Sequence, residues 1–321
     1  MQYSTFAAID IGSYDVILEI FEISKKQGIR SVDKICHRME LGKDTYTLGK
    51  IRPEMEEELC RVLADFVRIM EGYRVDAYRA MASSAISEAA NSLYVLGKIR
   101  QLTGLSVTVL SNSEQRFLGY KALAAMEDNF NKVIEKGTAI LDLDGGSFQI
   151  SLFDKDALVT TQNIRMGSLR VRERLAGIQS ETEHYEEMVE ELIWNEVSSF
   201  KKMYLKDRKI ENIMLIGDVF TDSVYQNIEE KTTKIISREN FNTWYEKIIR
   251  QSPMELAVKL GIPLENASLM YPSAVIYKCL IDMMEAEHVW IPGVHMTRGI
   301  AYEYAEQMKL QKGATTLKMI F

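Results

Sequence analysis

The 321-residue chain carries 39 Lys and Arg against 46 Asp and Glu, which gives it a formal net charge of -7. Hydrophobic residues make up 46% and charged residues 26% of the chain, a balance typical of a globular enzyme that excludes a disordered or fibrous protein. The acidic balance argues against non-specific binding to nucleic acid or to an anionic membrane, although a local pocket can still take an anionic substrate. A chain of this length predicts two domains of ordinary size.

The cysteines and the first residues indicate a compartment. Cys36, Cys60 and Cys279 are odd in number and form no C-x-x-C pair, so we expect no disulfide framework and a reducing cytosol. The histidines show no zinc-binding spacing. The start of the chain lacks a basic segment, and no apolar run approaches the roughly 18 residues of a membrane span. We therefore expect a cytoplasmic protein without a signal peptide.

The first half predicts the order β-β-β-α-β-α-β-α. Pro53 begins a helix whose apolar residues recur with a 3.6-residue period up to Met70. Strands are expected over residues 6–11, 16–23, 29–41, 75–81 and 105–110, and further helices over residues 87–101 and 113–126.

The second half starts the same order again. Strands are expected over residues 138–143, 149–153, 158–164 and 213–216, an amphipathic helix over His184–Leu205, and mainly helices after that. The polar segment 127–136 is the best boundary, so we expect lobes over residues 1–126 and 127–321. Each is predicted to be an α/β lobe with a five-stranded mixed sheet flanked by helices, and the last helix could return to the first lobe.

Each half contains an acidic residue and a Gly-Ser turn after its first strand. The first is Asp10-Ile11-Gly12-Ser13, and the second runs from Asp142 to Ser147 through Gly145 and Gly146. Successive amides of such a turn can bind an anion, the serine adds a hydroxyl donor, and the aspartate can hold a divalent ion. One such turn is usually only a hairpin, but two at equivalent places in repeated halves favour a phosphate site.

These turns and five further motifs resemble a known family. The pattern A-x-D-x-G-S over residues 8–13, with the mid-chain turn, resembles the actin-like ATPase superfamily. Motifs similar to those of its exopolyphosphatase / guanosine-pentaphosphate phosphatase (Ppx/GppA) members lie at residues 82–89, 110–115, 166–170, 216–218 and 295–299. The chain is thus identified as a short, two-domain member of that family.

The resemblance implies two actin-like, ribonuclease H-like lobes and hydrolysis of terminal phosphoanhydride bonds in polyphosphate or guanosine pentaphosphate. It implies a Mg²⁺ cofactor and a glutamate, matched by Glu114, that positions or deprotonates the attacking water in a cleft between the lobes. The residues implied to bind phosphate are Gly12, Ser13, Gly145, Gly146, Ser147, Gly217 and Arg170. Those implied to bind the metal are Asp142, Asp10 and Gln149. Without the resemblance, Glu114 would be read as a first-turn acid that favours the helix dipole.

Several positions depart from the family pattern. Ser87 and Thr297 stand where the family has arginine, Gln149 where it has an acid, and Asp144 and Asp218 where it has glycine. Each change removes a donor, a ligand or a close approach. The alternative to an active phosphohydrolase is therefore a catalytically degraded member that binds or senses phosphorylated ligands. A small-molecule kinase of the same superfamily fits the motifs less well. The sequence does not decide whether the protein forms a homodimer.

Overall fold

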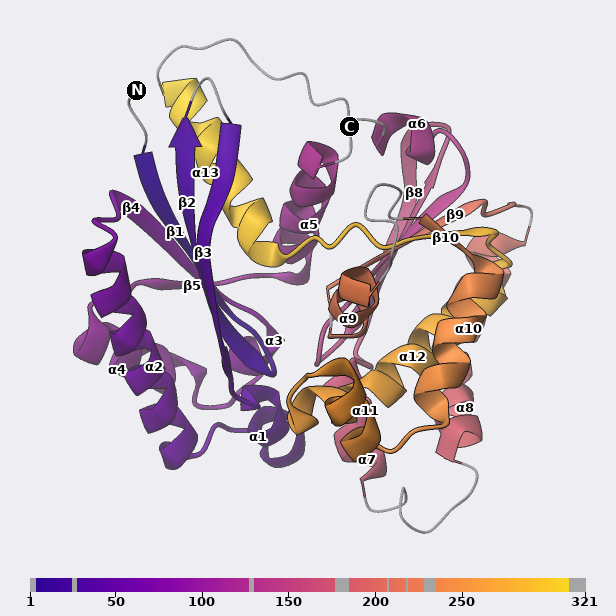
Figure 1. Ribbon diagram of the computed structural model, residues 1–321, viewed down its shortest axis with the longest axis horizontal. Helices are drawn as coiled ribbons and strands as arrows, with labels where there is room; N and C mark the ends of the chain where they lie inside the picture. Colours follow the sequence, from indigo (N-terminus) through magenta and orange to yellow (C-terminus); the bar gives the residue numbers. More distant parts are fainter. Residues whose placement is uncertain are drawn as a thin grey trace. The chain divides into compact units, whose positions relative to one another are not determined.

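The computed structural model describes residues 4–24, 28–126, 130–176, 185–206, 208–217, 219–227 and 235–311. The chain divides into two compact units. Among the described residues, unit 1 holds those up to Ala125 and those from His295 to Gln311, and unit 2 holds those from Met126 to Val294. Each unit is built on one mixed sheet flanked by helices (Figure 1), which confirms the α/β class.

The sheet of unit 1 has the strand order β3-β2-β1-β4-β5. Its strands are β1 (Ser4–Ile11), β2 (Asp15–Ser24), β3 (Gly28–Arg38), β4 (Ala77–Ala82) and β5 (Val107–Val109). β1, β2 and β3 pair antiparallel, whereas β1, β4 and β5 run parallel. The carboxyl ends of β1, β4 and β5 therefore lie at one edge of the sheet.

Helices cover both faces of this sheet. They are α1 (Leu41–Leu48), α2 (Pro53–Gly72), α3 (Ser84–Ser87), α4 (Ser92–Thr103), α5 (Asn112–Met126) and α13 (Met296–Gln311). Side chains alternate along β1, so that Ile9 and Ile11 pack in one core with residues of α2 and α4, while Phe6 and Ala8 pack in another with residues of α5 and α13. The helices α2 and α4 lie on one face of the sheet, and α5 and α13 lie on the other (Figure 1). The Phe6 ring stacks on Tyr304 of α13 with centroids 4.2 Å apart, so α13 belongs to the core of unit 1.

The sheet of unit 2 repeats this topology. Its strands are β6 (Thr138–Leu143), β7 (Phe148–Asp154), β8 (Ala157–Ile164), β9 (Asn212–Ile216), β10 (Ile235–Ser237) and β11 (His288–Trp290), in the order β10-β11-β9-β6-β7-β8. The order β8-β7-β6-β9-β11 matches β3-β2-β1-β4-β5, with β6, β9 and β11 parallel. β10 pairs antiparallel with β11 and adds a sixth strand to the five expected.

The helices of unit 2 are α6 (Phe130–Ile134), α7 (Ser168–Leu175), α8 (Tyr185–Phe200), α9 (Val219–Asn227), α10 (Arg238–Ile249), α11 (Pro253–Leu260) and α12 (Leu264–Met284), and a π-helical turn, Lys201–Leu205, continues α8. Of these, α7 to α11 pack against α12, whereas α6 lies apart from it (Figure 1). The buried ring of Tyr277 on α12 contacts Phe220 of α9, which in turn contacts Phe241 of α10. In the described part of the chain, no helix combines the length and apolar character that a membrane crossing requires.

Two predicted elements differ from the structure. The strand expected over residues 29–41 ends at Arg38, and Leu41 begins α1 instead. The helix expected over residues 87–101 begins only at Ser92, as α4, and Ser87 instead ends the short α3. The break lies before Asn91, whose side chain hydrogen-bonds the amide and carbonyl of Ile51 at 3.0 and 2.8 Å. His184, expected to begin the next long helix, and residues 127–129 of the predicted boundary lie outside the described residues.

Candidate functional site

Three loops of unit 1 leave the carboxyl ends of its parallel strands and lie side by side. β1 and β4 stay in register up to the pair Ile11–Ala82. Beyond this pair, the Ser83 amide donates to the Ile11 carbonyl at 3.2 Å, and the Leu110 amide donates to the Ala82 carbonyl at 2.9 Å. The β1–β2 turn, the β4–α3 loop and the β5–α5 loop thus open at one edge, the place where open α/β sheets bind ligands.

The first Gly-Ser turn is closed by the Gly12 amide, which donates to the Asp15 carbonyl at 2.9 Å. Ser13 is fully buried, and its hydroxyl lies 2.7 Å from the Tyr46 hydroxyl and 3.4 Å from the Ser84 hydroxyl. The Tyr46 and Ser84 hydroxyls are 2.8 Å apart. Three hydroxyl groups therefore form a ring, and half-buried Tyr46 and Ser84 are its outer members.

The sequence motifs do not single out Tyr46. It lies on α1, where no helix is predicted, and a single tyrosine between polar residues carries no pattern. The neighbouring Thr45 hydroxyl donates to the Ala85 carbonyl at 2.7 Å and fixes α1 against α3. Ser87, at the position of the family arginine, is exposed at the end of α3, with its hydroxyl 3.4 Å from the Ser84 carbonyl.

Glu114 closes a capping box at the start of α5. The Ser111 amide and hydroxyl donate to Glu114 Oε2 at 2.8 and 2.6 Å, and the Glu114 amide donates to Ser111 Oγ at 3.3 Å. The hydroxyl and then the amide of Ser111 lower the pKa of Glu114 below its ordinary value. Glu255 makes the same three bonds with Ser252 at the start of α11, where the amide and the hydroxyl also lower its pKa. Capping alone therefore does not mark Glu114 as catalytic.

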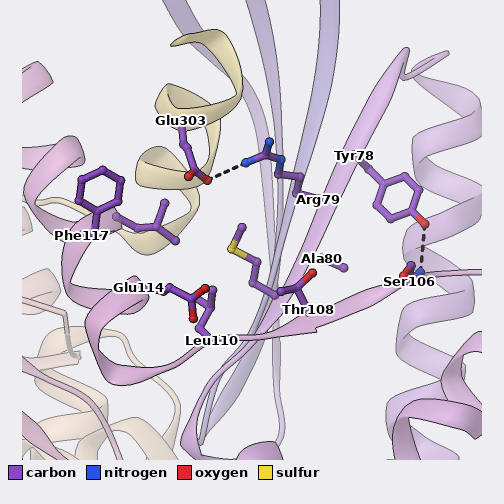
Figure 2. A pocket seen from close by; sticks show the side chains of 11 residues that line it. Tyr78, Arg79, Ala80, Ser106, Thr108, Leu110, Glu114, Phe117 and Glu303 are labelled. Atoms are coloured by element: carbon purple, nitrogen blue, oxygen red, sulfur yellow. Dashed lines mark hydrogen bonds and ion pairs between the residues drawn. The ribbon is translucent and has the colours of Figure 1, made fainter. Parts of the chain in front are cut away.

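Glu114 also lines a pocket of about 580 Å³ in unit 1, between β4, β5, α5 and α13. Figure 2 shows its carboxylate beside Leu110, with Thr108 of β5 on the neighbouring wall. On another wall, Arg79 of β4 forms an ion pair with Glu303 of α13 at 2.6 Å (Figure 2). Glu114 thus offers an exposed, ionised carboxylate to an open space.

The equivalent edge of unit 2 carries Asp142 and Gly217. β6 and β9 are parallel and in register up to the pair Asp142–Ile216. Gly217 follows with a φ of +104°, and a Cβ there would lie 2.5 Å from Asp142 Oδ1 and 2.7 Å from the Leu143 carbonyl. The Tyr277 hydroxyl of α12 donates to the Ile216 carbonyl at 3.1 Å. Glycine is therefore required for the backbone to approach the Asp142 carboxylate this closely.

The mid-chain turn follows β6 at the same edge. The Asp144 amide donates to the Ser147 carbonyl at 2.9 Å, and the Gly145 amide donates to the Asp144 side chain Oδ1 at 2.6 Å. Ser147 Oγ accepts a hydrogen bond from Asn163 Nδ2 at 3.2 Å, which leaves its hydroxyl proton for donation to another group. The turn therefore presents the Ser147 hydroxyl as a donor, but the Asp144 carboxylate already accepts the hydrogen bond of the Gly145 amide.

Asp142 and Gln149 face each other across the β6–β7 pair and fit a divalent ion. Gln149 is buried, and its Oε1 has no hydrogen-bond partner among the described residues. A buried oxygen without a hydrogen-bond partner, opposite a carboxylate, can coordinate a hard cation. Water and phosphate oxygens would complete the coordination shell of the ion. In the described part of the chain, no cluster of three or more His, Cys, Asp or Glu side chains could hold a metal by itself. Asp10 belongs to β1 of unit 1.

Residues 19–308 match the model of the Ppx/GppA phosphatase family. The chain belongs to this family. A bifunctional 3-dehydroquinate synthase/phosphatase of Fusobacterium nucleatum is 21% identical over 238 residues, which are 70% of this chain and 34% of that protein. Exopolyphosphatase 1 of Mycobacterium leprae is 25% identical over 144 residues, or 44% of this chain and 41% of that one. The matches span less than half the length of these curated relatives.

Solved structures show the same fold. An exopolyphosphatase from Cytophaga hutchinsonii superposes with a TM-score of 0.81 at 17% identity and covers 97% of this chain and 99% of its own. The Ppx/GppA family member of Aquifex aeolicus gives a TM-score of 0.74 at 18% identity, with 98% and 100% covered. The predicted two-lobed, actin-like fold of the family is therefore confirmed.

Within each unit, the structure brings predicted Ppx/GppA site residues to one sheet edge. In unit 1 these are Gly12, Ser13 and Glu114, and in unit 2 they are Asp142, Gly145, Gly146, Ser147 and Gly217. Arg170 lies on α7 with its Nε 2.9 Å from the Gly146 carbonyl. That the two sets face one cleft stays a prediction, as do the individual roles. Asp218 lies outside the described residues.

One departure from the Ppx/GppA pattern has a structural reason. Thr297, at a family arginine position, is fully buried on α13, and its hydroxyl donates to the carboxylate of Glu19 on β2. The other Glu19 oxygen accepts from the Ser31 hydroxyl at 2.6 Å. Position 297 thus belongs to the packing of α13 on the sheet.

Proposed function

We propose that this protein hydrolyses the terminal phosphoanhydride bond of inorganic polyphosphate or guanosine pentaphosphate, and that Glu114 positions the attacking water. Membership of a phosphatase family supports the reaction class. The observation that carries the proposal is the ionised Glu114 carboxylate, which follows the end of β5 and lines an open pocket between β4, β5, α5 and α13.

Phosphoryl transfer needs an oriented nucleophile more than it needs a strong base. A carboxylate with a lowered pKa is a weak base at neutral pH, but it accepts a hydrogen bond from water and holds the oxygen in place. Because the Ser111 hydroxyl and amide both donate to Oε2, the Glu114 side chain is fixed at the start of α5. In this proposal the carboxylate orients water and takes its proton as the water oxygen bonds to the terminal phosphorus. The bond from that phosphorus to the bridging oxygen breaks at the same time, and the shortened chain leaves with the bridging oxygen.

The phosphate group would be bound by the mid-chain turn of unit 2, with the Ser147 hydroxyl donating to a phosphoryl oxygen. Asp142 and Gln149 would hold Mg²⁺, which neutralises charge on the phosphate oxygens when it is bound. Hydroxyl groups also line the loops of unit 1, where half-buried Tyr46 and Ser84 are the outer members of the ring with Ser13. The cytoplasm, where polyphosphate and nucleotides meet free Mg²⁺, is the proposed location.

The proposal is tested by phosphate release from polyphosphate, measured with and without MgCl₂. Release should require the ion and should fall by about a hundredfold or more in Glu114→Gln, the range expected for a lost general base. Glu255→Gln is the matched control, because Gln can close a capping box as Glu does. The control should keep wild-type activity. Equal activity of the two variants would contradict a catalytic role for Glu114.

A second candidate function is the binding or sensing of phosphorylated ligands by a weakened site. The observation that favours it is the 2.6 Å hydrogen bond from the Gly145 amide to the Asp144 carboxylate. This carboxylate competes with phosphate for the same donor and repels the anion. Gln149, as a neutral residue, would also hold a metal less strongly than a carboxylate.

The triple change Ser87→Arg, Asp144→Gly and Gln149→Glu separates the two candidates. If the site is weakened, the change should raise Mg²⁺-dependent phosphate release, because charge-assisted contacts to phosphate are each worth on the order of 1.5–3 kcal/mol. Adding Glu114→Gln should abolish that gain. A folded triple variant with no gain would show that these three positions do not limit the wild-type enzyme.

A further inference from the structure

The start of α7 contacts three successive carbonyl groups of the mid-chain turn. The Ser168 amide donates to the Asp144 carbonyl at 3.2 Å, and the Arg170 amide donates to the Gly145 carbonyl at 2.9 Å. The Arg170 side chain continues the series, since its Nε donates to the Gly146 carbonyl at 2.9 Å. The turn is thus bound from one side by two backbone amides and one side chain of α7. Both amides lie in the first turn of the helix, where N–H groups have no intrahelical partner.

These contacts set the direction of the peptide groups in the turn. In a trans peptide the N–H points opposite to the C=O of the same unit, and the described residues contain no cis peptide. The Gly145 and Gly146 carbonyls face α7, so the N–H groups of Gly146 and Ser147 point away from α7. Amides pointing to one side of a turn are the donors that bind an anion.

α7 is fixed by contacts of its own, so it can hold the peptide groups of the turn in one orientation. A Cβ at Gly167 would lie 2.2 Å from the Asp144 carbonyl, so only glycine lets the helix begin this close to the turn. On the opposite side, Arg172 Nη1 donates to Ser268 Oγ of α12 at 2.8 Å. The buried side chains of α7 are Leu169, Val171 and Leu175.

We propose that Arg170 is a positioning residue that aims the amides of the glycine turn at a phosphoryl group through the Nε–H bond to the Gly146 carbonyl. The identity of the anion rests on the proposed function, whereas the orientation of the turn does not. This role differs from direct phosphate binding, in which the positive charge of the guanidinium would act. In the positioning role, a neutral N–H donor at the same place is sufficient.

Two substitutions at position 170 separate the effect of the Nε–H hydrogen bond from the effect of the positive charge. Gln places an amide nitrogen at the same number of bonds from Cα as arginine Nε, so Arg170→Gln removes the charge and keeps the donor. Met places a methyl group there, so Arg170→Met removes both. Arg174, exposed one turn later with its Nη1 3.8 Å from Met166 Sδ, provides the matched controls Arg174→Gln and Arg174→Met.

The experiment measures hydrogen exchange of the peptide that spans the turn, together with KM and kcat for polyphosphate. In Arg170→Met, exchange of the turn amides should rise about threefold or more, and KM should rise about fivefold, as expected for one lost hydrogen bond. Arg170→Gln should stay within about twofold of wild type in both measurements. The Arg174 variants should match wild type.

An equal rise of KM in both Arg170 variants, with unchanged exchange of the turn, would overturn the proposal and assign Arg170 to direct phosphate binding. Arg170→Gln decides this even if Arg170→Met fails to fold. If the wild-type protein releases no phosphate, the proposed function fails, but the exchange measurement still tests the positioning role. Unchanged exchange in folded Arg170→Met would then contradict it.

Discussion

Glu114 and Glu255 make the same hydrogen bonds at the first turns of two helices, and both have a lowered pKa. Local chemistry therefore does not distinguish a catalytic carboxylate from a capping one. Position does: Glu114 follows β5 at the edge where the Gly12–Ser13 turn opens and lines a pocket, whereas Glu255 begins α11 after another helix. The catalytic hypothesis depends on this position.

The lowered pKa values predict how the two capping boxes respond to acid. A carboxyl group with a folded-state pKa below its unfolded value stabilises the protein above the unfolded pKa, and this contribution is lost as the pH falls through the folded pKa. Glu114→Ala and Glu255→Ala should therefore cost more unfolding free energy at pH 7 than at pH 4. Urea unfolding at both pH values measures the difference. A cost that is constant or larger in acid would mean that the folded carboxylates are not held ionised.

At the residue scale, the sequence predicts the positions that follow readable strands. The two Gly-Ser turns and Glu114 come directly after or close to strand ends, so an apolar pattern and a motif locate them. Tyr46 and the Gly145–Asp144 bond could not be predicted, because they depend on tertiary contacts and on the direction of single peptide groups. The hydrogen bond from the Arg170 side chain to the Gly146 carbonyl could not be predicted for the same reason.

Helix α13 is fixed to the sheet of unit 1 by a buried hydrogen bond between Thr297 and Glu19. Glu19 is 3% exposed, and hydroxyl groups from two other elements bind its two oxygens. A buried carboxylate oxygen that loses its donor is costly, because neither water nor another group replaces the bond. The element is thus held by a polar contact as well as by the Phe6–Tyr304 stack.

Thr297→Val should therefore lower the free energy of unfolding by about 1–3 kcal/mol, the cost of one unsatisfied buried acceptor. The two side chains have nearly the same shape, so little packing is lost. Thr243→Val is the control, because the Thr243 hydroxyl bonds only a carbonyl of its own exposed helix turn at 3.1 Å among the described contacts. Denaturant unfolding checks both. Equal, small losses would show that Glu19 does not need the Thr297 donor.

At the element scale, prediction succeeds where the local pattern and the tertiary structure agree. β6 has the predicted bounds, since Thr138–Leu143 is an apolar run that ends in a glycine turn. The pattern fails at Met39 and Leu41, which alternate with Glu40 as in a strand but enter the core under α2 as the chain turns into α1. It also misses β10 and β11, which have three residues each and are too short to show a period.

The whole molecule repeats one strand order in two units, and each unit brings its turns to the carboxyl edge of its parallel strands. The same protein has a formal net charge of -7, although its proposed substrate is a polyanion. Long-range repulsion should slow the encounter of two negative partners, and salt screens such repulsion over roughly 10 Å at 0.1 M.

We therefore predict that kcat/KM for polyphosphate rises, by about two- to threefold, as monovalent salt is raised from roughly 20 to 150 mM at fixed Mg²⁺. Initial rates at substrate concentrations below KM measure this. A steep fall with salt would instead indicate a positive surface that attracts the polyanion and would contradict the repulsion expected from the overall charge.

The most direct test of the central claim is the fate of the oxygen of water during the reaction. Tripolyphosphate or guanosine pentaphosphate is incubated with the protein and Mg²⁺ in ¹⁸O-water, and the products are examined by ³¹P NMR. Attack of water on the terminal phosphorus predicts one ¹⁸O atom in each released inorganic phosphate and none in the remaining chain. Label in the remaining chain, or no phosphate release by the folded wild-type protein, would contradict hydrolysis of the terminal phosphoanhydride bond.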